Sequence, residues 1–321
     1  MSAFRTNIEL QSSPFRISHK DKILFNGSCF TDNIGQKLKD LHFQARINPF
    51  GVVYNPLSVM NSLGILLDGE EFKEEDLEFQ NELWFSWDHH SSFSNPDKAA
   101  CLEAINKEIK ISSKHLKKTK FLLVTFGTAW IFRLKKTGQV VANCHKVPAK
   151  EFDRILLSQE DIVKPWSIFI NELLDKNKEL KIIFTVSPVR HWKDGAHGNQ
   201  LSKSVLLLAI DQLCREFPEN TEYFPAYEIL LDDLRDYRFY DDDLLHPNKL
   251  AIEYIWNFFE KVYFDKETLE VNKELKKIIL AKNHRIYHNN TEAYRKFKAK
   301  LADQVTILNK KYPFLELKNT L

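Results

Sequence analysis

Two continuous apolar runs, KFLLVTFG (120–127) and KIIFTVS (181–187), constrain the fold of this 321-residue chain most strongly. A strand with one face in water alternates apolar and polar residues, whereas an unbroken apolar run of this length predicts a strand that is buried on both faces. Such strands belong to parallel sheets with helices on both sides. A helix-like pattern at 158–175 separates the two runs. The sequence therefore predicts an α/β fold with a mostly parallel sheet.

The beginning of the chain repeats this strand–turn–helix order. KILFN (22–26) stops at Gly27 and is followed by a helix pattern at 32–41. A second unit runs from QARI (44–47) through a turn at 48–51. Further helices are expected at 56–67, 97–113 and 201–216, with another starting at Pro247, where proline would occupy the first helical position, and a hairpin is expected at 131–142 with its turn at Thr137-Gly138.

The composition is that of a globular protein, with 43% hydrophobic and 28% charged residues. The formal charge of +2 gives no overall attraction to nucleic acid or to acidic membranes. No run approaches the ~18 apolar residues of a membrane span. The start of the chain lacks a secretory signal pattern, and the four cysteines contain no CxxC pair. We therefore expect a cytoplasmic protein without a disulfide framework or a zinc ribbon.

The region after Asp265 has a different character, and we predict an α/β domain at 1–264 with a helical C-terminal extension at 265–321. Two helix patterns cover 266–283 and 291–311. Thirteen basic against seven acidic residues give this region a charge of +6. A nucleic-acid grip is one interpretation, but an apolar stripe favours docking on the body of the protein. The stripe consists of Tyr294, Phe297, Leu301, Val305 and Leu308.

Ligands of open parallel sheets bind beyond the carboxyl ends of the strands, where polar and ionisable residues concentrate in this sequence. Cys29 lies in the first such loop, between a strand end and a helix start. A helix N-terminus stabilises a thiolate, so we expect a lowered pKa and a nucleophilic role for Cys29. The alternative is a small buried hydrophobe, which is the expected role of Cys101 and Cys214 inside helix patterns.

Asp243 and His246 lie three residues apart in the last loop, and Pro247 restricts His246 to an extended conformation. A histidine held in this way, with a carboxylate to orient its ring, can deprotonate a nucleophile and later protonate the leaving group. The alternative is an acidic, solvated loop. The DxxH spacing gains its significance from Cys29 at the other end of the chain.

Other polar residues of these loops are candidates for substrate contacts. Thr128 and Asn143 could donate hydrogen bonds to an oxyanion or could simply cap turns. Arg190, beside His191, is interpreted either as a hook for a carboxylate or phosphate or as a structural ion pair. Asp88-His89-His90 raises the question of a metal, but no set of ligands with recognisable spacing can be assembled. We therefore expect neither a catalytic metal nor a cofactor.

Eight segments in order resemble the GSCFA family, which is related to the SGNH (GDSL-type) hydrolases. They are FNGSCFTDNIG, NPFGVVYNP, TFGTAWIF, VANCHKVP, SPVRHWKDG, LSKS, DDDLLHPN and HRIYHNNTEAYRKF. The resemblance covers nearly the whole chain. It implies a three-layer α/β/α fold that is SGNH-hydrolase-like, and chemistry on ester bonds.

The resemblance also implies roles for individual residues. Set against the SGNH pattern, Cys29 takes the nucleophile position, Ser28 stands where an aspartate is usual, and Gly51 resembles the oxyanion glycine of the second block. Asp243 and His246 match the DxxH. The sequence departs from the pattern at 127–130, where the oxyanion asparagine of the third block is missing. Ser28 remains a rival nucleophile.

We therefore expect an esterase-type hydrolase or acyltransferase that acts on an O-acyl or O-acetyl bond of a small-molecule or glycan ester. No nucleic-acid or membrane partner is expected. The alternative is a non-catalytic binding module on a hydrolase scaffold, in which the Arg190 loop and the basic C-terminal region recognise an anionic glycan or nucleotide.

Overall fold

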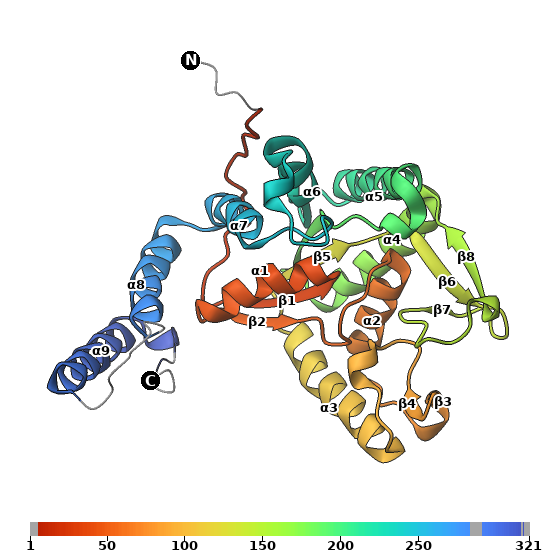
Figure 1. Cartoon of the computed structure of the whole chain (residues 1–321), viewed down its shortest axis with the longest axis horizontal. Helices are drawn as coiled ribbons and strands as arrows, with labels where there is room; N and C mark the ends of the chain where they lie inside the picture. The colour runs from red at the N-terminus through yellow and green to blue at the C-terminus, as the bar shows by residue number, and fades with distance from the viewer. Residues whose placement is uncertain (1–5, 283–290, 316, 318–321) are drawn as a thin grey trace.

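A five-stranded parallel sheet in the order β10-β9-β5-β1-β2 forms the centre of the computed structural model, which describes residues 6–282, 291–315 and 317 (Figure 1). The two apolar runs are its central strands β5 and β9, as the sequence predicted. The strands are β1 (Lys22–Gly27), β2 (Gln44–Ile47), β5 (Phe121–Phe126), β9 (Lys181–Val186) and β10 (Thr221–Tyr223).

Alternate residues of these strands enter two separate hydrophobic cores, because successive side chains of a strand point to opposite faces. Leu24 of β1 lies in one core, whereas Ile23 and Phe25 lie in the other. Helices α2 (Pro56–Asp68), α3 (Lys98–Leu116), α4 (Gln159–Lys176) and α5 (Gly195–Glu216) cover the first face, and α1 (Cys29–Asp40) and α7 (Lys249–Tyr263) cover the second. This arrangement agrees with the predicted α/β fold and is consistent with three layers.

Smaller elements surround the sheet. The predicted hairpin is present as β6 (Trp130–Leu134) and β7 (Val140–Val141), and β8 (Phe152–Leu156) extends it to three antiparallel strands. The short strands β3 (Glu78–Gln80) and β4 (Leu83–Phe85) form a second hairpin. After β10, α6 (Ala226–Glu228) continues into a π-helical turn, η5 (Ile229–Leu234), and a 3-10 turn, η6 (Tyr237–Phe239).

The start of α7 differs from the expectation that Pro247 would be its first residue. The helix begins at Lys249, and the Asn248 side chain accepts hydrogen bonds from the N–H groups of Leu250 and Ala251. Asparagine is among the best N-cap residues, because its side-chain oxygen satisfies N–H groups that the helix leaves free. Pro247 therefore lies just before the cap and keeps the chain extended at His246.

The C-terminal extension consists of α8 (Lys266–Lys282) and α9 (Glu292–Lys311), which lie beside α7 at one end of the molecule (Figure 1). Val271 and Leu275 of α8, with Val305 and Leu308 of α9, join the same core as Trp256 of α7. Leu301 is also buried, while Phe297 is 37% exposed, so the C-terminal end of the expected stripe docks. Residues 284–290 of the last quoted segment lie outside the described residues.

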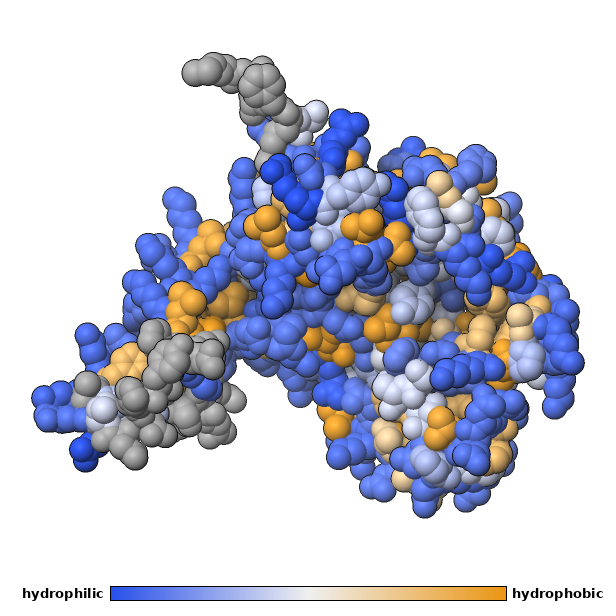
Figure 2. All heavy atoms as spheres, viewed as in Figure 1, coloured by the Kyte–Doolittle hydropathy of each residue, from blue (hydrophilic) through white to orange (hydrophobic). Residues whose placement is uncertain are grey.

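Hydrophilic side chains cover most of the face seen in Figure 2, and the hydrophobic ones form small groups, one of them over α8. Within the described ranges, no helix is both long and apolar enough to cross a membrane.

Candidate functional site

A cavity of about 460 Å³ lies where the loops that follow β1, β5 and β9 meet. Cys29 and His246, which are far apart in the sequence, both line it. This is the edge of the sheet at which parallel α/β proteins bind their ligands. Of the residues predicted for the site, those that line this cavity are Ser28, Cys29, Thr128, Asn143, Arg190, His191 and His246.

The turn from β1 into α1 places Cys29 at the cavity. Gly27 ends the strand with φ +146, and a Cβ atom there would lie 2.2 Å from the carbonyl oxygen of Thr125 in β5. Only glycine permits this close approach of two backbones. The N–H of Ser28 then donates to the same carbonyl, at 3.1 Å, and Cys29 becomes the first residue of α1.

The thiol of Cys29 does not have the lowered pKa that its helix position predicted. Burial, and after it the Asp32 carboxylate one turn along α1, raise the pKa of Cys29 above its ordinary value. The N–H groups of Cys29 and Phe30 and the charge of Lys203 act in the opposite direction but do not outweigh them. Desolvation penalises the charged form of any acid, and here it exceeds the effect of the helix N-terminus. The thiol is therefore protonated at neutral pH.

Asp243 and His246 form the predicted pair. Oδ2 of Asp243 lies 2.5 Å from Nδ1 of His246, and Oδ1 accepts hydrogen bonds from the N–H groups of Leu245 and His246, both at 2.9 Å. These three bonds, first among them the one from the His246 N–H, lower the pKa of Asp243 to about 2. The carboxylate is therefore charged at neutral pH and holds the imidazole in one orientation, which leaves Nε2 free for proton transfer.

Backbone strain supports the same loop. Leu244, between the paired residues, has φ +60, which is unfavourable for a leucine, and its side chain is 54% exposed. The backbone is closed by a bond from the N–H of Asp241 to the carbonyl of His246, at 2.8 Å. A strained conformation that the surrounding bonds impose is common at functional sites.

Ser28, the rival nucleophile, is 1% exposed and lines the cavity. Its backbone stands at the N-cap position of α1, but its side chain makes no capping bond. Within the described part of the chain, its hydroxyl oxygen has no hydrogen-bond partner. Burying an unpaired hydroxyl costs free energy, so this atom is available to a bound ligand.

Of the residues predicted to hold an oxyanion, the structure places some at the cavity and one away from it. The N–H of Gly51 donates to the Asn48 carbonyl at 2.8 Å, and the residue lies against His90 rather than on the cavity wall. The structure therefore does not bring Gly51 to the site. Thr128 lines the cavity, but its hydroxyl bonds Ser202 at 3.1 Å and accepts the N–H of Trp130.

Asn143 also lines the cavity. Its side-chain oxygen accepts the N–H of His145 at 2.9 Å, a bond that does not involve the amide NH₂ group. The Asn143 NH₂ therefore remains a candidate donor to a bound oxyanion.

Sequence reasoning missed Lys203, which is fully buried on α5 beneath the cavity. Its ammonium group donates to the carbonyls of Gly127 and Ser187, at 2.6 and 2.7 Å, and so joins the loops that follow β5 and β9. Burial lowers the pKa of Lys203 to about 7. Its signal in the sequence is a lysine within the apolar stripe of α5, three residues before Leu206 and seven before Ile210.

Tyr54 is the second residue that the sequence did not single out, although it lies within the NPFGVVYNP segment. Burial, followed by the nearby Cys29 and Asp32, raises the pKa of Tyr54, so its phenol stays protonated as a hydrogen-bond donor. Its carbonyl accepts the N–H of Gly127 at 2.7 Å, which fixes the residue beside the β5 loop.

One wall of the cavity comes from the loop after β9. The His191 ring stands edge-on to Tyr54, with centroids 5.6 Å apart, and the backbone N–H of His191 donates to the side-chain oxygen of Asn199. Burial, and next the charge of Lys203, lower the pKa of His191 to about 4, so the ring is neutral. Arg154 pairs with Asp194 on the same wall.

In the histidine-rich segment at 88–90, His89 belongs to the core. His89 is fully buried between Phe50 and Phe93, with Nδ1 3.1 Å from the Ser86 hydroxyl. Asp88 bonds instead to Asn61 on α2. Among the residues that the structure describes, no three His, Cys, Asp or Glu side chains converge as metal ligands would.

Two family models match this chain. The model of the GSCFA family matches residues 22–259, and that of the GSCFA domain protein, C-terminal domain, matches residues 275–321. A search of curated proteins found no match. The first of these family matches spans both Cys29 and His246 and covers well over half of the chain, which places this protein in the GSCFA family.

Proposed function

We propose that this protein is an esterase-type hydrolase or acyltransferase that acts on O-acyl bonds through Cys29, His246 and Asp243. The observation that carries the proposal is that Cys29 and the Asp243-oriented imidazole line one cavity. A nucleophile, a base and a residue that orients the base are the minimum for acyl transfer.

In the first step, Sγ of Cys29 attacks the carbonyl carbon of the ester while Nε2 of His246 takes the thiol proton. This proton transfer is necessary because the raised pKa of Cys29 keeps the thiol protonated at neutral pH. As the tetrahedral intermediate collapses, the C–O bond breaks and the same proton passes to the leaving oxygen. The products of this half-reaction are an alcohol and an acyl thioester on Cys29.

In the second step, water or an acceptor alcohol gives a proton to His246 and attacks the thioester. The C–S bond breaks, and the proton returns to the thiolate. The intermediates carry negative charge on the former carbonyl oxygen, for which the donors are the Tyr54 hydroxyl, the Asn143 amide and the first N–H groups of α1. This donor set replaces the asparagine and the glycine that the SGNH pattern led us to expect.

A relationship to SGNH hydrolases is part of the proposal. It is supported by the parallel sheet with helices on both faces, by a nucleophile candidate directly after β1, and by a DxxH just before the last helix of the α/β body. Other α/β hydrolases share these features, so the residues of the site are what support the proposed chemistry.

Turnover of activated esters tests the proposal. Purified protein should hydrolyse p-nitrophenyl acetate slowly, because the natural alcohol and its binding energy are absent. Cys29→Ala and His246→Ala should each abolish this activity, and the double variant should be no worse than either. Cys144→Ala is the matched control, since Cys144 lines the same cavity but has no part in the proposed mechanism. Wild-type rates equal to those of Cys29→Ala across acetyl, butyryl and glycan O-acetyl esters would contradict the proposal.

The second candidate is a binding module that recognises an anionic glycan or nucleotide without turnover. The protonated thiol of Cys29 and the arginines around the site favour it. Tight binding of such a ligand by a protein that hydrolyses none of the panel would select this candidate.

A further inference from the structure

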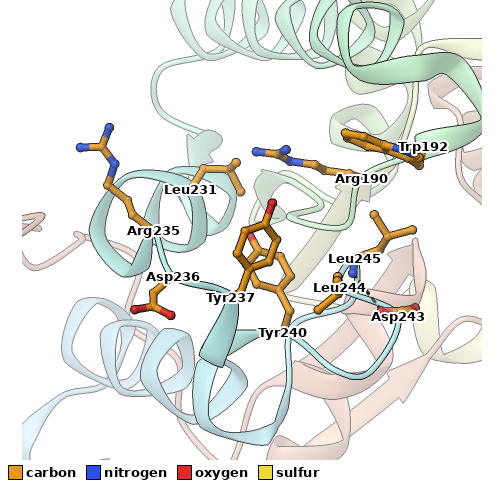
Figure 3. Close-up of a pocket in the computed structure, with 10 residues that line it drawn as sticks. All are labelled: Arg190, Trp192, Leu231, Arg235, Asp236, Tyr237, Tyr240, Asp243, Leu244 and Leu245. Carbon is orange, nitrogen blue, oxygen red and sulfur yellow. Dashed lines mark hydrogen bonds between the residues drawn. The ribbon is translucent and has the colours of Figure 1, made fainter.

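A second cavity, of about 500 Å³, adjoins the one that holds Cys29 (Figure 3). Arg190 lines both cavities, and the Asp243–His246 pair lies between them, with Asp243 on this second cavity and His246 on the first. Arg190 and Trp192 come from the loop after β9, whereas Arg235, Tyr237 and Tyr240 come from the segment around η6.

The charges of this second cavity are unbalanced. Asp236 accepts the N–H of Arg238 and pairs with its guanidinium, and Asp243 is committed to His246. In contrast, no carboxylate of the described residues lies within ion-pair distance of Arg190 or Arg235, and Nε of Arg190 is buried without a partner. The Arg190 and Arg235 guanidinium groups, which lie on either side of Leu231 in Figure 3, are therefore each available for an anion. A planar guanidinium matches a carboxylate or a phosphate.

Aromatic faces accompany these charges. Tyr237 and Trp192 are 74% and 52% exposed, and the Tyr237 and Tyr240 rings lie 6.0 Å apart. In Figure 3 the Arg190 guanidinium extends toward Leu231, and the hydroxyl of Tyr237 points toward the same guanidinium. Exposed aromatic rings next to unpaired cations suit a ligand that has a flat apolar face and a negative charge.

We infer that this second cavity binds the alcohol part of the substrate, and that this alcohol carries a carboxylate or a phosphate, as an acidic sugar or a sugar phosphate does. The inference rests on the proposed function. His246 must protonate the leaving oxygen, so an ester with its carbonyl carbon at Cys29 extends its alcohol past His246, toward the loop that holds Asp243. The acyl group remains in the first cavity.

Matched aryl esters test this assignment. The probes are 4-acetoxybenzoate, 4-acetoxyphenyl phosphate and the neutral methyl 4-acetoxybenzoate, and the readout is the ratio of kcat/KM for each anionic ester to that for the neutral one. Arg235→Met should lower this ratio about tenfold, the effect of losing one charge-assisted hydrogen bond. Arg215→Met is the charge-matched control, because Arg215 pairs with Asp211 on α5 and lines neither cavity.

The larger of the two anionic ratios identifies the preferred anion. An unchanged ratio in Arg235→Met, or an equal fall in Arg215→Met, would overturn the inference while leaving the proposed function intact. Binding separates the two claims: Cys29→Ala protein should bind 4-hydroxybenzoate or phenyl phosphate in NMR titrations, with affinity about tenfold lower when Arg235→Met is added. If Arg235→Met lowers this affinity but the wild-type protein hydrolyses none of the esters, the assignment of the cavity is supported and the esterase is contradicted. No difference in binding would overturn the assignment.

Discussion

Oδ2 of Asp243 lies 2.5 Å from Nδ1 of His246, while Oδ1 of the same carboxylate holds the N–H groups of Leu245 and His246. One side chain thus shapes the loop and orients the imidazole. These two roles can be separated by substitution, because asparagine keeps an oxygen for the backbone N–H groups but loses the charge that stabilises an imidazolium.

Asp243→Asn should therefore leave the fold intact and lower turnover of p-nitrophenyl acetate by about a hundredfold or more, the range of general acid–base contributions. Asp243→Ala should lower turnover at least as much and also loosen the loop. The two variants are compared by kcat and by amide exchange at Leu245 and His246. Equal activity of Asp243→Asn and wild type would show that the carboxylate does not serve the histidine.

The raised pKa of Cys29 predicts a distinctive alkylation profile. The rate of iodoacetamide labelling at Cys29 should reach half its maximum at a pH above the ~8.5 of a free cysteine. Lys203→Met should leave this midpoint nearly unchanged, because Lys203, with a pKa of about 7, has already lost its charge at such a pH. Peptide mass spectrometry after timed labelling measures both midpoints. A midpoint below that of a free cysteine would mean that the helix N-terminus affects the pKa of Cys29 more than burial does.

Lys203 should make stability depend on pH. Its folded pKa of about 7 lies below the ~10.4 of an unfolded lysine, so between these values the unfolded chain binds a proton that the folded chain does not. The free energy of unfolding therefore rises with pH above about 7, by at most ~1.4 kcal/mol per pH unit. Urea denaturation between pH 7 and 8.5 should show a stability difference between wild type and Lys203→Met that grows with pH. A constant difference would mean that the buried amine does not titrate there.

His89 should make the free energy of unfolding depend on pH on the acid side. Burial lowers the pKa of His89 to about 3, against ~6.5 in an unfolded chain. As the pH falls through this window, His89 of the unfolded chain binds a proton that buried His89 of the folded protein does not, so the free energy of unfolding decreases. His89→Phe should reduce this slope by up to ~1.4 kcal/mol per pH unit. Denaturation at pH 7, 6 and 5 measures the slope, and identical slopes in the two proteins would contradict the account.

Much of the fold could be predicted from the sequence, because its strongest patterns have local causes. The buried runs at β5 and β9 and the amphipathic helices repeat with the periods of their structures. The short strands β3, β4, β8 and β10 could not be predicted, since segments of three to five residues depend on partners that lie elsewhere in the chain. Asn248 is the N-cap of α7 because its side chain accepts hydrogen bonds from two N–H groups of the helix, which proline cannot do.

Three residues of the candidate site could be chosen from the sequence, because they are chemically reactive residue types in loops that follow strands or precede a helix. They are Cys29, Asp243 and His246. What the sequence could not supply is the environment of each group. Burial depends on the packing of distant elements, and it reverses the expected pKa direction of Cys29. Lys203 resembles an ordinary helix residue in the sequence, because its partners in the loops after β5 and β9 are known only from the structure.

Locating the acyl group on the protein during turnover would show directly whether Cys29 is the nucleophile. After brief mixing with p-nitrophenyl acetate and acid quenching, peptide mass spectrometry should find an acetyl group on Cys29 in the wild type. The peptide should remain unmodified in Cys29→Ala, and Ser28→Ala should still be acetylated at Cys29. Acetylation of Ser28 in the wild type, or turnover without any acetyl group on the peptide that contains both residues, would contradict the role of Cys29 as the nucleophile.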